Sequence, residues 1–253
     1  MLRTFIVLAV VALGIPAAAG VPQADPAADF AALTARLEKA AVNDDAQGVK
    51  DARIACMRLL AAAPSGPKAA LVRYTIAYAG WRLAFSPMIT AAEQDGMLAD
   101  AEQQLQQALK ADGSFAEAYG LLASVYGARI AKNTELGMTL GPASGEMLGR
   151  AMSLDGGNPR FLMMQATNLL HTPAEYGGDA KQAEAVFRQA LKAFDKEPAG
   201  KPWPTWGRFD AHVWLGQALA GRGDAEGARA EYRAALAIAP QSARVKGLLA
   251  SLK

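Results

Sequence analysis

Residues 211–242 read AHVWLGQALAGRGDAEGARAEYRAALAIAPQS, and this stretch decides the fold. Two segments rich in alanine and leucine, which favour helices, flank the turn residues Gly223 and Asp224. Pro240 follows the second segment and cannot continue a helix, so it ends the unit. The stretch therefore predicts a helix–turn–helix hairpin.

Small side chains recur where the two helices of this hairpin must approach each other. Gly216 lies on the first helix, and Ala228 and Ala235 lie on the second. Tyr232 comes one turn after Ala228 on the same helical face, where it fills the space between neighbouring hairpins. The second helix thus has the pattern small–x3–large–x2–small.

The second-helix pattern recurs along the chain, which indicates an internal repeat. It is found at Ala101, Leu105, Ala108; at Ser144, Leu148, Ala151; at Ala183, Phe187, Ala190; and, in a degenerate form, at Ala52, Cys56, Leu59. Turn residues separate the copies. Several copies in series exceed what chance gives in an alanine-rich chain.

These spacings resemble the tetratricopeptide repeat, a helix–turn–helix unit with a closing proline. The resemblance implies an all-α fold, a right-handed superhelical array of about five hairpins with a C-terminal capping helix. It also implies a non-enzymatic protein that binds a protein or peptide on its concave face. The clearest repeats cover residues 95–155, 158–195 and 208–242.

The copies are spaced more widely than the 34 residues of a regular array. The excess is expected in enlarged loops at about 130–143, 171–179 and 196–207, and such loops often form a binding edge. The expected hairpins pair residues 27–42 with 46–62, 67–85 with 91–111, 115–131 with 144–154, 159–170 with 180–195, and 208–221 with 225–238, and the capping helix covers 242–252.

The first twenty residues, MLRTFIVLAVVALGIPAAAG, form a separate segment. Arg3 precedes an apolar stretch that Pro16 breaks, and small residues follow, so we expect a signal peptide cut near Ala19 and Gly20. The alternative is an uncleaved anchor, but the apolar stretch is short of the roughly 20 residues of a bilayer span. The expected mature chain, 21–253, is a single repeat domain without stable membrane insertion, in the periplasm of a Gram-negative bacterium or otherwise exported.

The composition narrows the classes of partner and site. The sequence has 26 Lys and Arg against 24 Asp and Glu, so no basic patch predicts nucleic-acid binding. Cys56 is the only cysteine and falls at a core position, so we expect a small buried hydrophobe; a reactive thiol or an intermolecular bridge is the alternative. No cofactor is expected, and the oligomeric state stays open.

The stretch HTPAEYGGDAKQ, residues 171–182, places a histidine and two carboxylates beside a glycine pair. Asp179 and Gln182 have the spacing of a helix capping box, and Gly177 permits a turn at positive φ. The alternative is a ligand or catalytic loop, but His171 and Glu175 alone make a weak metal site. This loop resembles one found in exported bacterial tetratricopeptide proteins and in helical accessory subunits of certain periplasmic solute transporters.

The register of the repeats predicts which residues face the inner surface and bind a partner. They are Glu117, Ser124, Met163, Thr167, His171, Asp210 and Gln217. Trp203 and Trp206 are expected either as interface anchors or as a cover over the gap between the fourth and fifth hairpins. Tyr78, Trp81 and Phe85 share a helical face and are expected to pack in the core.

Three functions remain at this stage. The first is a periplasmic scaffold that binds a protein or peptide. A polar groove open at both ends would favour this function. The second is a small-molecule-binding accessory subunit of a periplasmic solute transporter, which needs an enclosed apolar pocket near the two tryptophans. The third is an enzyme, which the sequence disfavours because no Gly-x-Ser-x-Gly elbow or oriented histidine is present.

Overall fold

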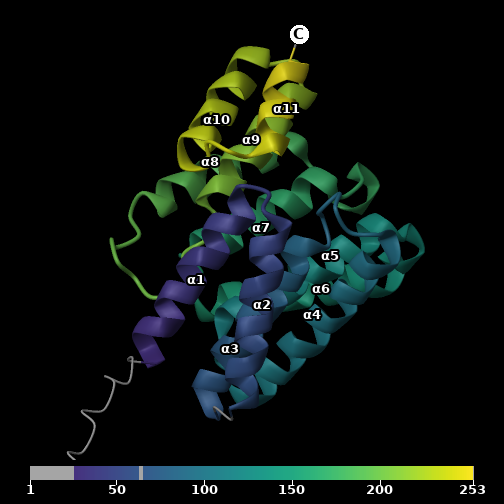
Figure 1. Cartoon of the computed structure of the whole chain (residues 1–253). Helices are drawn as coiled ribbons and strands as arrows, with labels where there is room; N and C mark the ends of the chain where they lie inside the picture. Colours follow the sequence, from purple (N-terminus) through teal and green to yellow (C-terminus); the bar gives the residue numbers. More distant parts are fainter. Residues whose placement is uncertain (1–25, 63–64, 253) are drawn as a thin grey trace, which may run out of the picture.

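The computed structural model describes residues 26–62 and 65–252, and these residues form α-helices and short 3-10 helices without a β-strand (Figure 1). The predicted signal peptide lies outside the described residues. The elements are α1 Pro26–Val42, α2 Ala46–Ala61, α3 Gly66–Leu83, α4 Ala91–Ala111, α5 Ala116–Lys132, η1 Thr134–Leu136, α6 Gly137–Leu154, α7 Pro159–His171, η2 Ala174–Tyr176, α8 Ala180–Phe194, α9 Arg208–Gly221, α10 Ala225–Ile238 and α11 Ala243–Ser251.

Consecutive helices pack as antiparallel hairpins, so the predicted all-α repeat array is confirmed. The pairs are α1 with α2, α3 with α4, α5 with α6, α7 with α8, and α9 with α10, and α11 packs on α10. The repeat positions lie between the helices, whereas the closing Pro240 is exposed; buried are Ala101, Leu105, Ala108, Ala183, Phe187, Ala190, Gly216, Ala228, Tyr232 and Ala235.

The small residues are needed for close contact between helices. A Cβ on Gly216 would lie 2.5 Å from Cε1 of Tyr232, so only glycine fits there. Cys56 is fully buried, and burial raises the pKa of its thiol to about 12. Cys56 is therefore an unreactive core residue in the folded protein.

The third hairpin differs from the prediction in its second helix. We expected a loop over about 130–143 and a helix from residue 144, but η1 and the first two turns of α6 occupy most of that span. Pro142 lies inside α6. It is the sixth residue of the helix, in the second turn, so α6 continues through a proline that removes one intrahelical hydrogen bond.

The array curls until its first and last hairpins touch. In Figure 1 the upper end of α1 lies beside the part of the molecule formed by α7 and α9. The turn after α1 reaches the turn before α11, where Asn43 Oδ1 accepts a hydrogen bond from the Gln241 backbone N–H at 3.0 Å. The first hairpin and the C-terminal end of the array are therefore in direct contact.

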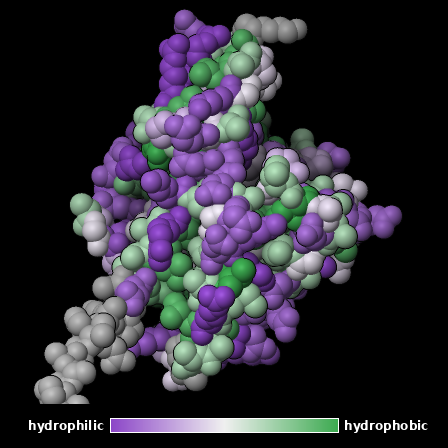
Figure 2. Space-filling view, viewed as in Figure 1, coloured by the Kyte–Doolittle hydropathy of each residue, from purple (hydrophilic) through white to green (hydrophobic). Residues whose placement is uncertain are grey.

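The outer surface mixes polar and apolar residues. In Figure 2 the end of the molecule formed by α10 and α11 is mainly hydrophilic, and hydrophobic residues gather lower down, around α2 and α3. On α2, Ile54 and Met57 are partly exposed. Among the described helices, none is long and apolar enough to cross a bilayer.

Candidate functional site

The loop between α8 and α9 crosses the inner surface and is anchored there by its two tryptophans. Trp203 donates from Nε1 to Oγ1 of Thr75 at 3.1 Å. Trp206 donates from Nε1 to the hydroxyl of Tyr74 at 2.7 Å. Both acceptors belong to α3, so a loop from the C-terminal half of the chain is bound to the second hairpin.

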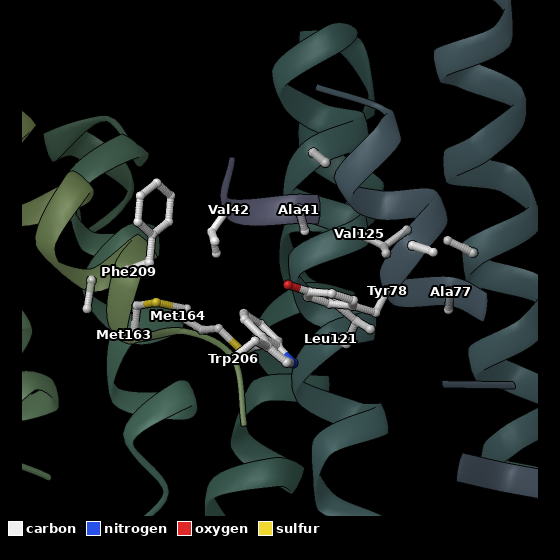
Figure 3. Close-up of a cluster of buried hydrophobic side chains, with 14 of the residues drawn as sticks. Ala41, Val42, Ala77, Tyr78, Leu121, Val125, Met163, Met164, Trp206 and Phe209 are labelled. Carbon is white, nitrogen blue, oxygen red and sulfur yellow. The ribbon is translucent and has the colours of Figure 1, made fainter. Parts of the chain in front are cut away.

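Aromatic packing reinforces this anchor. The Trp206 ring lies 5.0 Å from the Tyr78 ring and 5.6 Å from the Trp81 ring, centroid to centroid. Figure 3 shows Trp206 between Tyr78 of α3 and the methionines Met163 and Met164 of α7. Only 1% of Trp206 is exposed. The indole therefore fills the space that an open array would leave to solvent.

The observed positions of the two tryptophans differ in part from those predicted from the sequence. Of the two predicted alternatives, the cover formed by the loop is found, but Trp206 packs against the second hairpin and not only in the gap between the fourth and fifth hairpins. A buried indole N–H needs an acceptor, and the inner face of α3 supplies hydroxyls at Tyr74 and Thr75. Phe85 was expected in the core but is exposed, and its ring lies edge-on against the Trp81 ring.

A buried ion pair joins helices from opposite ends of the array. Arg82 of α3 donates from Nη1 to both carboxylate oxygens of Asp210 of α9, at 2.8 and 3.0 Å. The same guanidinium donates from Nη2 to the carbonyl of Ala41 at the end of α1, at 2.9 Å. One side chain thus ties α1, α3 and α9 together. Burial alone would lower the pKa of Arg82, but the carboxylate beside it outweighs that effect and leaves the pKa raised.

A second ion pair fixes the start of the loop. Arg160 is fully buried and donates to Glu197 through Nη1 at 2.7 Å and Nη2 at 3.1 Å. Lys201 donates to the same carboxylate at 2.7 Å. Burial raises the pKa of Glu197, but these hydrogen bonds outweigh that effect and leave the pKa lowered. Glu197 is therefore held as a carboxylate at neutral pH.

The part of the inner surface that the loop leaves open is a groove of about 1090 Å³ between α1–α2 and α8–α10. We call it the α1–α9 groove. Its apolar lining includes Leu33, Val42, Ala55, Phe194, Phe209 and Ile238. Its charged lining includes Arg36, Glu38, Lys39, Asp51, Glu197 and Arg208. Both kinds of side chain are thus available to a bound molecule.

Glu38 projects from α1 into this groove. Its Oε2 accepts a hydrogen bond from Oγ1 of Thr205 in the loop, at 2.6 Å. Burial raises the pKa of Glu38, and the Thr205 hydrogen bond and Arg160 only partly counteract it. The charged form of Glu38 is consequently less favoured in the folded protein than in the unfolded chain.

We expect Glu38→Gln to stabilise the protein at pH 7 and to make no difference in acid. Because the pKa of Glu38 is raised on folding, protonation of Glu38 stabilises the folded state. This stabilisation is complete below the ordinary glutamate pKa of about 4.3 and is lost as the pH rises through the folded-state pKa. Glutamine keeps an acceptor for Thr205 without the buried charge. Urea unfolding of both proteins at pH 7 and pH 3.5 measures this; a variant less stable than wild type at pH 7 would contradict it.

The predicted partner-binding residues divide into three groups, and none of them lines the α1–α9 groove. Met163 and Asp210 are 3% and 4% exposed, and with Trp206 they are part of the closed interior, so their prediction as surface contacts is wrong. The half-buried residues are Glu117, Ser124, Thr167, Trp203 and Gln217. His171 is exposed at the end of α7, and its ring packs edge-on against Trp214 at 5.1 Å.

The groove residues of α1, above all Arg36, Glu38 and Lys39, were missed by the sequence analysis. They belong to the irregular first hairpin, where the repeat pattern is degenerate. Their position opposite α9 depends on the curvature of the whole array, for which a single sequence has no local signal. The three charged residues within positions 36–39 were the only available hint.

The loop after α7 is the capped turn that its sequence predicts. Asp179 Oδ1 accepts a hydrogen bond from the Gln182 backbone N–H at 2.9 Å, and Gly177 adopts φ +94°. A Cβ on Gly178 would lie 1.7 Å from the carbonyl oxygen of Thr172, so this position also requires glycine. The cap at Asp179 is confirmed, but of the two bonds of the predicted capping box only this one is formed.

Comparisons with known proteins agree with this architecture. The sequence model of the tetratricopeptide repeat family matches residues 177–252. No curated protein matches the sequence significantly. A thermophilic tetratricopeptide protein of Thermus thermophilus is 19% identical, with a TM-score of 0.59 over 81% of this chain and 91% of that chain.

A second solved structure has a similar fold. The haemophore HusA of Porphyromonas gingivalis is 25% identical, with a TM-score of 0.61 over 74% of this chain and 92% of that chain. The hairpins, their small-residue contacts and the match over residues 177–252 lead to one assignment. Residues 177–252 match the tetratricopeptide repeat family, and the described chain as a whole has the fold of a tetratricopeptide array.

Proposed function

We propose that this protein is an exported scaffold, in the periplasm of a Gram-negative bacterium, that binds a segment of a protein partner in the α1–α9 groove. The tetratricopeptide fold suggests a protein-interaction scaffold. The leader-like residues 1–20 support export. The observation that carries the proposal is the groove itself, the open remainder of an inner surface that is otherwise filled by the chain's own loop.

The groove suits a polypeptide segment for two reasons. At about 1090 Å³ it is as large as the biggest pockets that hold small molecules, and it is open to solvent along α1. Its lining alternates apolar side chains with charged ones, as a segment with both kinds of side chain requires.

Site-specific cross-linking in cells tests the proposal. A photoreactive amino acid is placed at Ala35, which is exposed in the groove, or at Ala99, which is exposed on α4 away from it. We expect a discrete protein adduct from Ala35 and none from Ala99. The adduct should disappear when Ala55→Trp, which puts an indole into the groove, is combined with the Ala35 probe. Equal adducts from both positions, or an Ala35 adduct insensitive to Ala55→Trp, would contradict the groove as the site.

A small-molecule ligand is the second candidate, because HusA is a haemophore and shares the fold over 92% of its length. A flat apolar ligand with carboxylates, such as haem, would find apolar walls in the groove and cations at Arg36, Lys39 and Arg208. Titration of the purified chain with haem, followed by its visible absorption, tests this function. Saturable binding that is lost in Ala55→Trp supports it, and the absence of saturable binding rules it out.

A further inference from the structure

The turn between α1 and α2 is bonded to the opposite end of the chain. Oδ2 of Asp44 accepts hydrogen bonds from Oγ of Ser242 at 2.8 Å and from the backbone N–H of Arg244 at 3.0 Å. Oδ1 of Asn43 accepts from the backbone N–H of Gln241 at 3.0 Å. Asp44 therefore acts as a capping carboxylate for α11, although it belongs to the first hairpin. We call these contacts the clasp.

Asp44 makes this contact from a backbone conformation that is unfavourable for most residues other than glycine. Among the described residues it is the only non-glycine with positive φ, at 60°. Aspartate tolerates this region better than most residues, but glycine adopts it without strain. What glycine lacks is the carboxylate, which is the group that bonds Ser242 and Arg244.

The clasp forms one end of the α1–α9 groove. Asn43 and Gln241 both line the groove, and Pro240 lies beside them. The long walls on the first-hairpin side are α1 and α2, through residues such as Ala35, Lys39 and Ala55. A change in the distance between the first hairpin and α10 would therefore widen or close the groove.

The first hairpin is held differently on its two sides. On the α2 side it packs against α3 and carries the Arg53–Asp100 ion pair to α4. At the end of α1, its links to the rest include the clasp, the Thr205–Glu38 hydrogen bond and the Ala41 carbonyl bonded by Arg82. The buried apolar side chains of this last turn, Ala40, Ala41 and Val42, are small, and Leu37 is fully buried just before them. Hydrogen bonds of this kind exchange with water at small net cost, unlike apolar packing.

We propose that α1 and α2 form a movable cover over the groove and that the clasp is its catch. Release of the catch lets the cover swing about its packing on α3 and widens the groove for an entering segment. The two positions are states of one equilibrium, and a partner that binds one of them better shifts it. This role rests on the proposed function, because it describes access to the same groove.

Distance measurements with spin labels test the catch without any partner. Labels are attached to cysteines introduced at Ala32 of α1 and Ala237 of α10, which are both exposed, while the native Cys56 is buried and stays unlabelled. Asp44→Gly removes the carboxylate and keeps the backbone turn. Asp45→Ala is the matched control, because Asp45 caps α2 through the Gly48 N–H and makes none of the clasp contacts.

We expect one short, narrow distance in wild type and in Asp45→Ala, and an added longer distance in Asp44→Gly. Asp44→Asn keeps one acceptor oxygen, which is enough for the two bonds that Oδ2 accepts, and should give a distribution close to wild type. Identical distributions in wild type and Asp44→Gly overturn the catch, and so does an equal lengthening in Asp45→Ala, which would indicate general loosening of the hairpin. Because cross-linking from Ala35 is measured separately, failure of the catch and failure of the groove are distinguished.

Discussion

Trp206→Ala is expected to lower the free energy of unfolding by about 3–5 kcal/mol, the range for loss of a large buried aromatic side chain. The indole is 1% exposed and fills the interior between α3 and α7. Its removal also leaves the buried Tyr74 hydroxyl without the Trp206 N–H. Chemical denaturation of the variant and wild type, monitored by far-ultraviolet circular dichroism, measures the difference.

Trp206→Phe is the matched control. Phenylalanine keeps most of the aromatic volume and loses the N–H, so we expect a smaller loss of about 1–3 kcal/mol. Trp214 of α9, which is half-buried and packs on His171, provides a second comparison. A loss below about 1 kcal/mol for Trp206→Ala would mean that the loop does not fill the interior.

Asp210→Ala should destabilise the protein by a similar amount, about 3–5 kcal/mol, because it leaves the buried Arg82 charge without its carboxylate. Arg82 has 10% of its side chain exposed and Asp210 has 6%. Arg244 is also 3.8 Å from Asp210, so the variant brings two cations together without the anion between them. Thermal unfolding at neutral pH measures the loss.

The double variant Arg82→Met, Asp210→Leu separates the pair from its surroundings. Apolar replacements of similar volume often restore stability where a single deletion does not, because no unpaired charge remains. We expect the double variant to be more stable than Asp210→Ala. If the double variant and Asp210→Ala are equally unstable, the unpaired charge of Arg82 does not explain the instability of Asp210→Ala. The loss of stability is then due to the packing of α9.

The hairpins could be predicted because their cause is local. A helix needs neighbouring residues with the right propensity, and a hairpin contact needs small side chains at fixed spacing, as at Gly216, Ala228 and Ala235. The cap at Asp179 is equally local. The start of α6 could not be placed in the same way, because Pro142 predicts a break where the helix in fact continues, and the residues before it carry no repeat pattern.

The closed interior could not be predicted from local patterns. The repeat register placed Met163 and Asp210 on the inner surface. It contains no information that the loop with Trp206 covers this surface and buries both residues. Small rotations between successive hairpins add up to the curvature that brings α1 opposite α9. Contacts such as Trp206–Tyr74 join residues more than a hundred positions apart. The groove forms only when such long-range contacts have brought its walls together.

The most direct test of this closed array is the exchange of the Trp206 indole N–H with deuterium, followed by NMR, with Trp206→Phe to identify its signal. If the loop is bound to α3, this N–H is protected and exchanges only in openings as rare as global unfolding. Exchange of the Trp206 N–H at the rate of a solvent-exposed indole, in a protein that is otherwise folded, would contradict the account.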